Sequence, residues 1–244
     1  RNHLKSVPMR KICLPGTHDS GAYTLSPRAV PGNTLPDWIC RIVNNKYLEC
    51  FTGPLTAVGV SWSVTQGIDI LEQLNDGVRY FDMRVALVDG HFHLVHTFLG
   101  PRLEPIIVEI AMFLAENDSE VLLLDFNHMY GMETPAAHEK FQHLIRKHLG
   151  DFMAGPDVGL EVTYGELMLQ RKQVIAFYIP CPHCPEAIDD AVAVDFWPCT
   201  DMWVQSPWPR SPSVNDLLPK LQVISKENSK RTTFFVLQAI VTPA

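Results

Sequence analysis

Short apolar runs alternate along the chain with longer segments in which apolar residues recur at helical spacing. Apolar runs of about four to eight residues predict buried strands, and a period of about 3.6 residues predicts amphipathic helices. The predicted strands cover residues 11–15, 78–84, 92–96, 121–127, 173–179, 192–196 and 233–240. The predicted helices cover residues 65–74, 103–116, 135–149 and 214–223. Strands that alternate with helices in this way predict an α/β fold with a mainly parallel sheet.

A right-handed series of strand–helix units closes most simply as a barrel, usually of eight strands. The pattern supplies seven strand candidates, so we expect a distorted TIM-like (β/α)8 barrel whose last strand lies beyond Ala244. Residues 1–244 are expected to form a single domain. Because the chain begins with Arg1 rather than Met, we expect it to be a segment of a longer protein. Residues 33–61 and 197–212 are predicted to be long irregular excursions at the rim of a site.

The composition argues against several classes of protein and partner. The chain has 20 Lys and Arg against 27 Asp and Glu, a net charge of −7, and no run of basic residues, which argues against nucleic acid. No apolar stretch approaches the ~20 residues that span a bilayer. Six cysteines in 244 residues are too few for a disulfide scaffold, so we expect a reducing, cytoplasmic compartment. We also expect a monomer.

Several motifs that could carry chemistry are weak in this context. Cys181-Pro-His-Cys184 has the spacing of half a zinc site, but no second such pair follows. The segment GVSWS at 59–63 resembles a nucleophile elbow without its last glycine. On the 92–96 strand, His96 faces away from His91 and His93, so the three imidazoles would not share a metal ion. We therefore expect no metal or cofactor site among these motifs.

Polar side chains gather instead where predicted strands end. Tyr80, Asp82 and Arg84 share one face of their strand, and His18 with Asp19 follows the first strand after Gly16. The ends of parallel strands meet at one mouth of a barrel, where active sites are built. A structural Asp–Arg pair and a merely solvated histidine remain alternative explanations at this point.

Two further strand ends add to the same mouth. His96 closes the third predicted strand, and Asp125 with Asn127 shares a face at the end of the fourth. Asp125 and Asn127 are suited to bind a polyhydroxylated substrate, although loop capping would also explain them. We also assign Tyr178, at the end of the next strand, to substrate binding. Two histidines, an arginine and two carboxylates together suit phosphodiester cleavage.

Tryptophan points to a second kind of contact. Five Trp residues lie mostly in the two irregular excursions, and the amphipathic indole ring is favoured at lipid interfaces. Packing in a core is the commoner fate of such residues, so we expect lipid contact from one or two of them: Trp38, Trp62, Trp197, Trp203 and Trp208.

Six segments together resemble the X-domain-containing family of phosphatidylinositol-specific phospholipases C. They are LPGTHDS at 14–20, WSVTQ at 62–66, LNDGVRYFDMR at 74–84, VH at 95–96, LLDFNHMYGM at 123–132 and FVLQAIVTP at 235–243. The resemblance covers nearly the whole chain and implies the barrel of the phospholipase C-like phosphodiesterases. It also implies a hydrolase that cleaves phosphatidylinositol to diacylglycerol and inositol 1,2-cyclic phosphate.

The same resemblance implies a role for each polar residue at the mouth. His18 would be the general base for the inositol 2-hydroxyl, and His96 the general acid for the diacylglycerol oxygen. Arg84 would supply the positive charge that calcium-dependent relatives take from an ion. Asp19 would orient His96, and Asp82 would support the site. The family also carries an Asp on its eighth strand that partners the first histidine, which we expect beyond Ala244.

The resemblance further implies partners and leaves two other functions open. We expect the phosphatidylinositol headgroup and a transient membrane surface as partners, with no metal and no cofactor. A catalytically weak relative that binds phosphoinositides or a protein is the first alternative. A metal-dependent glycerophosphodiesterase on a similar barrel is the second, and Arg84 argues against it because it stands where a cation ligand would be needed.

Overall fold

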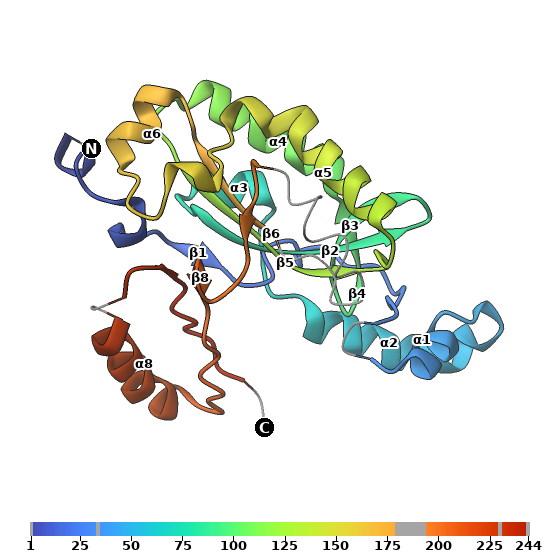
Figure 1. The fold of residues 1–244 in the computed structure, drawn as a ribbon. Helices are drawn as coiled ribbons and strands as arrows, with labels where there is room; N and C mark the ends of the chain where they lie inside the picture. The colour runs from blue at the N-terminus through green and yellow to red at the C-terminus, as the bar shows by residue number, and fades with distance from the viewer. Residues whose placement is uncertain (1, 33–34, 179–193, 229–230, 243–244) are drawn as a thin grey trace.

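The computed structural model describes residues 2–32, 35–178, 194–228 and 231–242, and a curved seven-stranded sheet lies at its centre (Figure 1). The order along the sheet is β4-β3-β2-β5-β6-β7, and β1 pairs separately with β2. The strands are β1 Gly16–Thr17, β2 Tyr80–Val88, β3 His91–His96, β4 Phe98–Arg102, β5 Leu122–Tyr130, β6 Val174–Tyr178 and β7 Trp197–Pro198. A second sheet pairs β8 Val204–Gln205 with β9 Phe234–Phe235.

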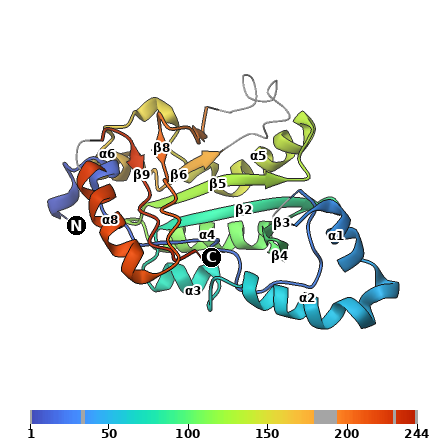
Figure 2. The same ribbon diagram turned by 90° about the horizontal axis from the view of Figure 1, so that it is seen from below.

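Helices cover the sheet on one side and project from it on the other. In Figures 1 and 2 α3, α4, α5 and α6 lie over the sheet, α1 and α2 project beyond β4, and α8 lies near β8 and β9. The helices are α1 Asp37–Val43, α2 Glu49–Ser63, α3 Ile70–Asn75, α4 Leu103–Glu116, α5 Pro135–Leu149, α6 Tyr164–Gln170 and α8 Val214–Asn228. Short 3-10 helices are η1 Asn2–Leu4, η2 Met9–Lys11, η3 Lys46–Leu48, η4 Gly150–Phe152 and η5 Pro156–Val158.

Alternation along the long strands separates two cores. On β2, Phe81 and Met83 are fully buried beneath the covering helices, where they join the larger apolar cluster. Tyr80 points to the other face, where it packs in a second cluster with Phe177 and Phe234. The even positions of β2 therefore face the concave side of the sheet, on which the site lies.

Two strands share one edge of β2, and they leave a gap between them. β1 pairs in parallel with Tyr80–Phe81, and β3 pairs in antiparallel with residues 85–88. Between these ladders, the edge of β2 at Asp82 faces the turn that follows β1. The gap brings that turn and the end of β3 to the same stretch of β2.

The sheet is less parallel than the sequence pattern predicts. β3 runs antiparallel to β2, and β4, which the pattern did not predict, runs antiparallel to β3. The reason is the two-residue turn of Asp89 and Gly90, with φ of 50° and 78°, which joins β2 and β3 as a hairpin. An Asp-Gly pair with both residues at positive φ is a turn that matches the twist of paired strands.

The prediction of an irregular excursion at 33–61 was wrong, because most of its described residues are helical. α1, η3 and α2 occupy residues 37–63 and form a helical hairpin. Gly53 and Pro54 lie inside α2 and conceal its helical character in the sequence. The second excursion, 197–212, holds β7 and β8 but is otherwise irregular, as predicted.

Other predictions differ from the structure at their boundaries. None of residues 11–15 lies in a strand, and β1 begins only at Gly16. Pro15 has no N–H to donate and offers only its carbonyl, which accepts from Arg79 and Tyr80. The 233–240 strand is reduced to Phe234–Phe235. The 192–196 strand lies partly outside the described residues, and its described part precedes β7. The helices predicted at 103–116 and 135–149 are confirmed as α4 and α5.

Candidate active site

The turn after β1 carries two of the candidate residues and is fastened to β2. Asp19 has a left-handed backbone, with φ of 45°, and its N–H donates to Asp82 Oδ2 at 3.0 Å. The N–H of Ser20 donates to the carbonyl of Asp82 at 2.9 Å. These bonds hold the strained turn in the gap beside β2 and place His18 above Asp82.

All five residues predicted to be catalytic meet in one cluster. His18 is held from both sides, with Nδ1 2.9 Å from Asp82 Oδ2 and Nε2 2.9 Å from Asp19 Oδ2. The same oxygen of Asp19 lies 3.3 Å from His96 Nε2, and Arg84 Nε forms an ion pair with the other oxygen of Asp19. The two carboxylates are buried, whereas the side chains of His18, Arg84 and His96 are partly exposed.

His96 lies in this cluster because the β2–β3 hairpin reverses the direction of the chain. β3 runs back along β2, so its last residue lies near the gap rather than at the far end of the sheet. Its Nδ1 lies 2.7 Å from the carbonyl oxygen of Ser63, the last residue of α2. A carbonyl only accepts, so Nδ1 carries a hydrogen and Nε2 faces Asp19. His93 does not contact Asp19, and its Nδ1 lies 3.0 Å from the carbonyl oxygen of Gly100.

The electrostatics favour a charged imidazole at His18. Burial opposes that charge, but the contacts with Asp19 and Asp82 outweigh it and raise the pKa of His18 from 6.5 to about 9. Burial likewise favours the neutral form of Asp82, yet the hydrogen bond from His18 and the charge of Arg84 lower its pKa below the ordinary value. The resting site therefore holds a protonated His18 between two carboxylates at neutral pH.

A buried polar chain supports Asp82 from below. Asn127 donates to Asp82 Oδ1 at 2.9 Å and to Asp125 Oδ2 at 3.1 Å. Asp125 Oδ2 also accepts the hydroxyl of Tyr80 at 2.5 Å, and Cys199 Sγ lies 3.5 Å from Asp125 Oδ1. Burial raises the pKa of Asp125 to about 6. Of the predicted substrate-binding residues, Asn127 thus adjoins the cluster, whereas Asp125 lies beneath it.

Tyr178 does not reach the cluster. It is fully buried in β6, level with Phe126, and its hydroxyl contacts Nδ1 of His138 on α5. The β6 residue level with Asp125 is Phe177, so Tyr178 points to the helical side of the sheet. The Cys181–Cys184 segment lies outside the described residues. The GVSWS segment lies inside α2, where no nucleophile elbow can form.

The structure adds residues that the sequence interpretation did not assign. Gln66 donates to the carbonyl of His18 at 2.7 Å, and Thr65 donates to the carbonyl of Asp19 at 2.9 Å. Trp208 packs against the His18 ring with centroids 5.1 Å apart. The WSVTQ segment was a signal for Thr65 and Gln66, but no local pattern linked Trp208 to a residue 190 positions earlier.

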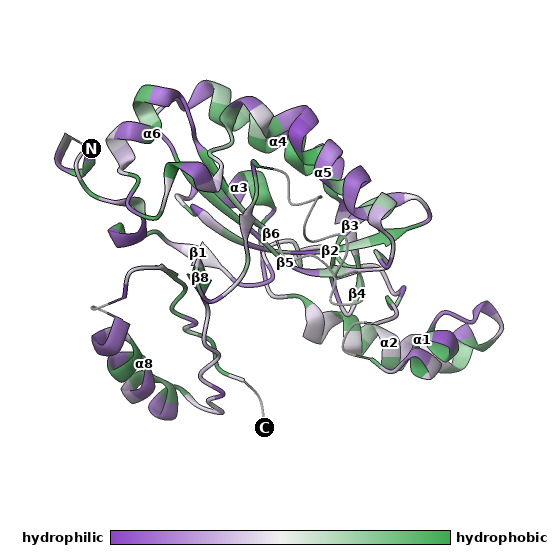
Figure 3. Ribbon diagram, in the orientation of Figure 1, coloured by the Kyte–Doolittle hydropathy of each residue, from purple (hydrophilic) through white to green (hydrophobic). Residues whose placement is uncertain are grey.

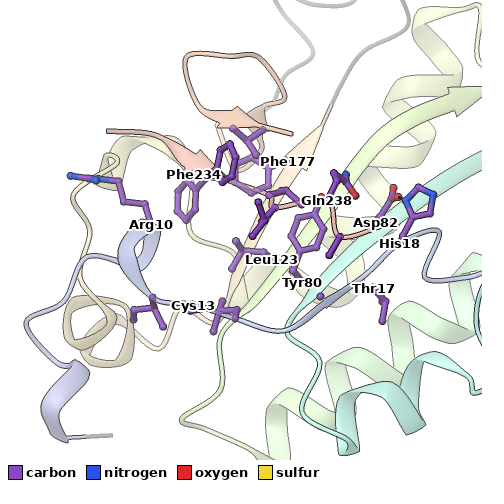
Figure 4. A pocket seen from close by; sticks show the side chains of 18 of the residues that line it. Arg10, Cys13, Thr17, His18, Tyr80, Asp82, Leu123, Phe177, Phe234 and Gln238 are labelled. Atoms are coloured by element: carbon purple, nitrogen blue, oxygen red, sulfur yellow. Dashed lines mark ion pairs between the residues drawn. The ribbon is translucent and has the colours of Figure 1, made fainter. Parts of the chain in front are cut away.

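A cavity of about 400 Å³ with a mainly apolar lining reaches the cluster at His18 and Asp82. Figure 4 shows Tyr80, Leu123 and Phe177 along its wall, with His18 and Asp82 at one end. His18 and Asp82 thus line a concave region, as expected for a site that binds a small molecule.

Some of the same groups could also hold a cation. Among the described residues, His18, Asp19 and Asp82 offer ligand atoms within 4.8 Å of one another. Arg84, however, already pairs with Asp19 and lies 3.7 Å from Asp82 Oδ2. A divalent ion would have to compete with the guanidinium group for these carboxylates. Nothing in the described part of the chain resembles a membrane span, since its helices lack the required length and apolar character.

The chain is similar to known proteins over nearly its whole length, although no family model matches it. It is 30% identical to PI-PLC X domain-containing protein 2 of Mus musculus, over 99% of this chain and 67% of that protein. It is 28% identical to PI-PLC X domain-containing protein 3 of Homo sapiens, over 98% of this chain and 71% of that protein.

Solved structures show the same fold. The phosphatidylinositol-specific phospholipase C of Listeria monocytogenes superposes with a TM-score of 0.65 at 16% identity, over 98% of this chain and 77% of that one. A mutant of the Staphylococcus aureus enzyme gives a TM-score of 0.60 at 13% identity, over 95% and 73% of the two chains. These likenesses confirm the predicted TIM-like α/β fold.

Proposed function

The chain belongs to the family of PI-PLC X domain-containing proteins, and on that premise we propose that it cleaves phosphatidylinositol by general acid–base catalysis. The proposal depends above all on one observation, the position of Asp19 Oδ2 between Nε2 of His18 and Nε2 of His96. Two imidazoles so placed are suited to take one proton and give another within a single site.

The proposed reaction forms one phosphorus–oxygen bond and breaks another. His18 takes the proton of the inositol 2-hydroxyl, whose oxygen attacks the phosphorus. The bond from phosphorus to the diacylglycerol oxygen breaks, and His96 gives its Nε2 proton to that oxygen. Arg84 stabilises the negative charge on the phosphoryl oxygens. The products are diacylglycerol and inositol 1,2-cyclic phosphate, with His18 left charged and His96 left neutral.

The proton on His18 must move before this reaction begins. A base with a pKa of about 9 is charged at neutral pH, and a charged imidazole accepts no proton. Asp19 Oδ2 contacts both Nε2 atoms, so it offers a path for the proton from His18 to His96. Asp82 then retains the Nδ1 hydrogen of His18 and leaves the lone pair on Nε2, the role that Asp has in a serine-protease triad.

Hydrolysis of phosphatidylinositol vesicles in EDTA tests the proposal, with inositol 1,2-cyclic phosphate measured by phosphorus NMR. We expect turnover in EDTA, because Arg84 takes the place of an ion. His18→Ala and His96→Ala should each lower kcat by about 10²–10⁴. His91→Ala is the matched control, since His91 is an exposed histidine of the same hairpin. Full activity in either active-site variant, or activity only with added calcium, would contradict the mechanism.

Binding without turnover is the second candidate function. The observation in its favour is the charged His18, which with Arg84 presents two cations suited to a phosphate but no ready base. It predicts that the wild-type chain binds a soluble inositol phosphate in calorimetry yet releases no cyclic product at any pH. Arg84→Ala should then abolish binding.

A further inference from the structure

Large apolar side chains lie on the solvent side of α2. Phe51, Leu55 and Trp62 are 81%, 76% and 84% exposed, and Val58 is exposed between them. Their spacing of i, i+4, i+7 and i+11 places all four on one stripe of the helix. An amphipathic helix normally buries such a stripe, so this one is available to a partner.

The opposite side of α2 explains why the stripe faces outward. Thr56, Gly59 and Ser63 form the side that packs on the protein, and the space at Gly59 is taken by the ring of Phe98 on β4. An added Cβ at Gly59 would lie 3.2 Å from that ring. The helix therefore rests on its small residues and turns its large apolar residues away from the core.

Two more exposed aromatic residues lie on the elements that precede α2 in the chain. Tyr47 in η3 is 93% exposed, and Trp38 in α1 is also largely exposed. Figure 3 shows green and pale colours along α2 in the part of the molecule that projects beyond β4. We call this surface the docking face. It consists of Trp38, Tyr47, Phe51, Leu55, Val58 and Trp62.

The chemistry of the docking face favours lipid over a charged partner. Residues 50–68 carry no charged side chain, and the one charge of α2 is Glu49 at its first residue, so insertion of the rest of the helix would desolvate no charge. Tyr47 and the two tryptophans have the amphipathic rings that are enriched where a bilayer meets water. A neutral, aromatic surface of this kind is suited to the headgroup–acyl boundary and independent of lipid charge.

The helix that carries the docking face ends beside the candidate active site. It ends at Ser63, whose carbonyl holds Nδ1 of His96. In the proposed reaction His96 gives its proton to the diacylglycerol oxygen, and diacylglycerol stays in the bilayer. A bilayer against α2 would therefore lie beside the residue that must meet the lipid part of the substrate.

We propose that the docking face is the surface by which this protein binds a lipid bilayer, with α2 lying in the interface. The choice of a bilayer over a protein partner rests on the proposed function, because that function requires a lipid substrate at His96. Since the face carries no cluster of cations, apolar insertion drives the binding, and high salt does not abolish it.

Sedimentation with vesicles of phosphatidylcholine alone tests the docking face without any turnover. The double variant Phe51→Ser and Trp62→Ser should reduce partitioning by about 100-fold, since full burial of one such side chain is worth about tenfold or more. Leu169→Ser is the matched control, because Leu169 is 87% exposed on α6, away from the face. Circular dichroism and the melting temperature establish that the double variant is folded.

The outcomes separate this inference from the proposed function. Wild-type binding that survives high salt and is lost in the double variant supports the docking face, even if the protein cleaves no lipid. Equal partitioning of the double variant and the wild type overturns the inference, as does wild type that fails to sediment. A wild-type dimer that the double variant converts to a monomer, measured by analytical ultracentrifugation, would assign the face to a second copy instead.

Discussion

Replacing Asp82 by Asn removes one of the two carboxylates that hold the charge on His18. The rise in the His18 pKa from 6.5 to about 9 corresponds to about 3 kcal/mol of preference for the charged ring, at about 1.4 kcal/mol for each tenfold change. Asp82 lies as close to His18 as Asp19 does, at 2.9 Å. We therefore expect Asp82→Asn to lower the His18 pKa by at least about one pH unit.

The same interaction makes stability depend on pH. Because the pKa of His18 is higher in the folded than in the unfolded chain, its contribution is complete below pH 6.5 and is lost as pH rises through about 9. The free energy of unfolding attributable to His18 should thus fall by about 3 kcal/mol over this range. Asp82→Asn should flatten that fall, and His18→Gln should remove it.

Two measurements check this reasoning. Histidine ring resonances followed by NMR give the His18 pKa directly, and urea unfolding at a series of pH values gives the stability. Asp89→Asn is the control, since it removes an exposed carboxylate that pairs with Arg28. A His18 resonance that titrates near 6.5 in the wild type, or one that Asp82→Asn leaves unmoved, would refute the claim that the two carboxylates hold a charged imidazole.

Two other changes follow from the contacts around the site. Because Trp208 packs on His18 and a charged imidazole quenches indole emission more than a neutral one, fluorescence should rise with a midpoint near pH 9. Trp208→Phe should abolish that rise, and an unchanged rise would show that another indole reports the titration. Thr97→Gly should raise the free energy of unfolding by about 1 kcal/mol, because Thr97 has a φ of 62°, which is strained for a β-branched residue. Thermal unfolding measures this gain, and a lower melting temperature would show that the strain is negligible.

The candidate site could be predicted because most of its residues lie on or directly after predicted strands, where alternation sets the face to which each side chain points. Alternation on β2 placed Asp82 and Arg84 on one face, and in the structure both contact Asp19. Gly16 marked the turn that carries His18. The same rule failed for Tyr178, because the sequence did not show which residue of β6 lies level with Asp125. Register depends on contacts between segments, so it was not accessible from one strand alone.

The hairpin shows how a correct residue can follow from an incorrect topology. His96 was placed at the mouth on the assumption that its strand ran parallel to β2, whereas β3 runs antiparallel. It reaches Asp19 because β2 continues beyond Arg84 and β3 returns along that extension. The Asp89-Gly90 turn was a local signal for this arrangement, and it outweighs the general expectation that strands alternate with helices.

The helical hairpin of α1 and α2 escaped prediction for a physical reason that bears on function. Pattern analysis assigns large apolar residues to the core, yet α2 buries Thr56 and Ser63 and exposes Phe51 and Trp62. Its stripe has helical spacing, but Gly53 and Pro54 interrupt the propensity that would have revealed it. Exposed apolar residues of this kind lower the solubility of a protein. Their position on α2, the helix that ends beside His96, therefore indicates a partner that covers them. Because the helix ends on the carbonyl that fixes His96, the partner that best fits is the bilayer from which the proposed substrate comes.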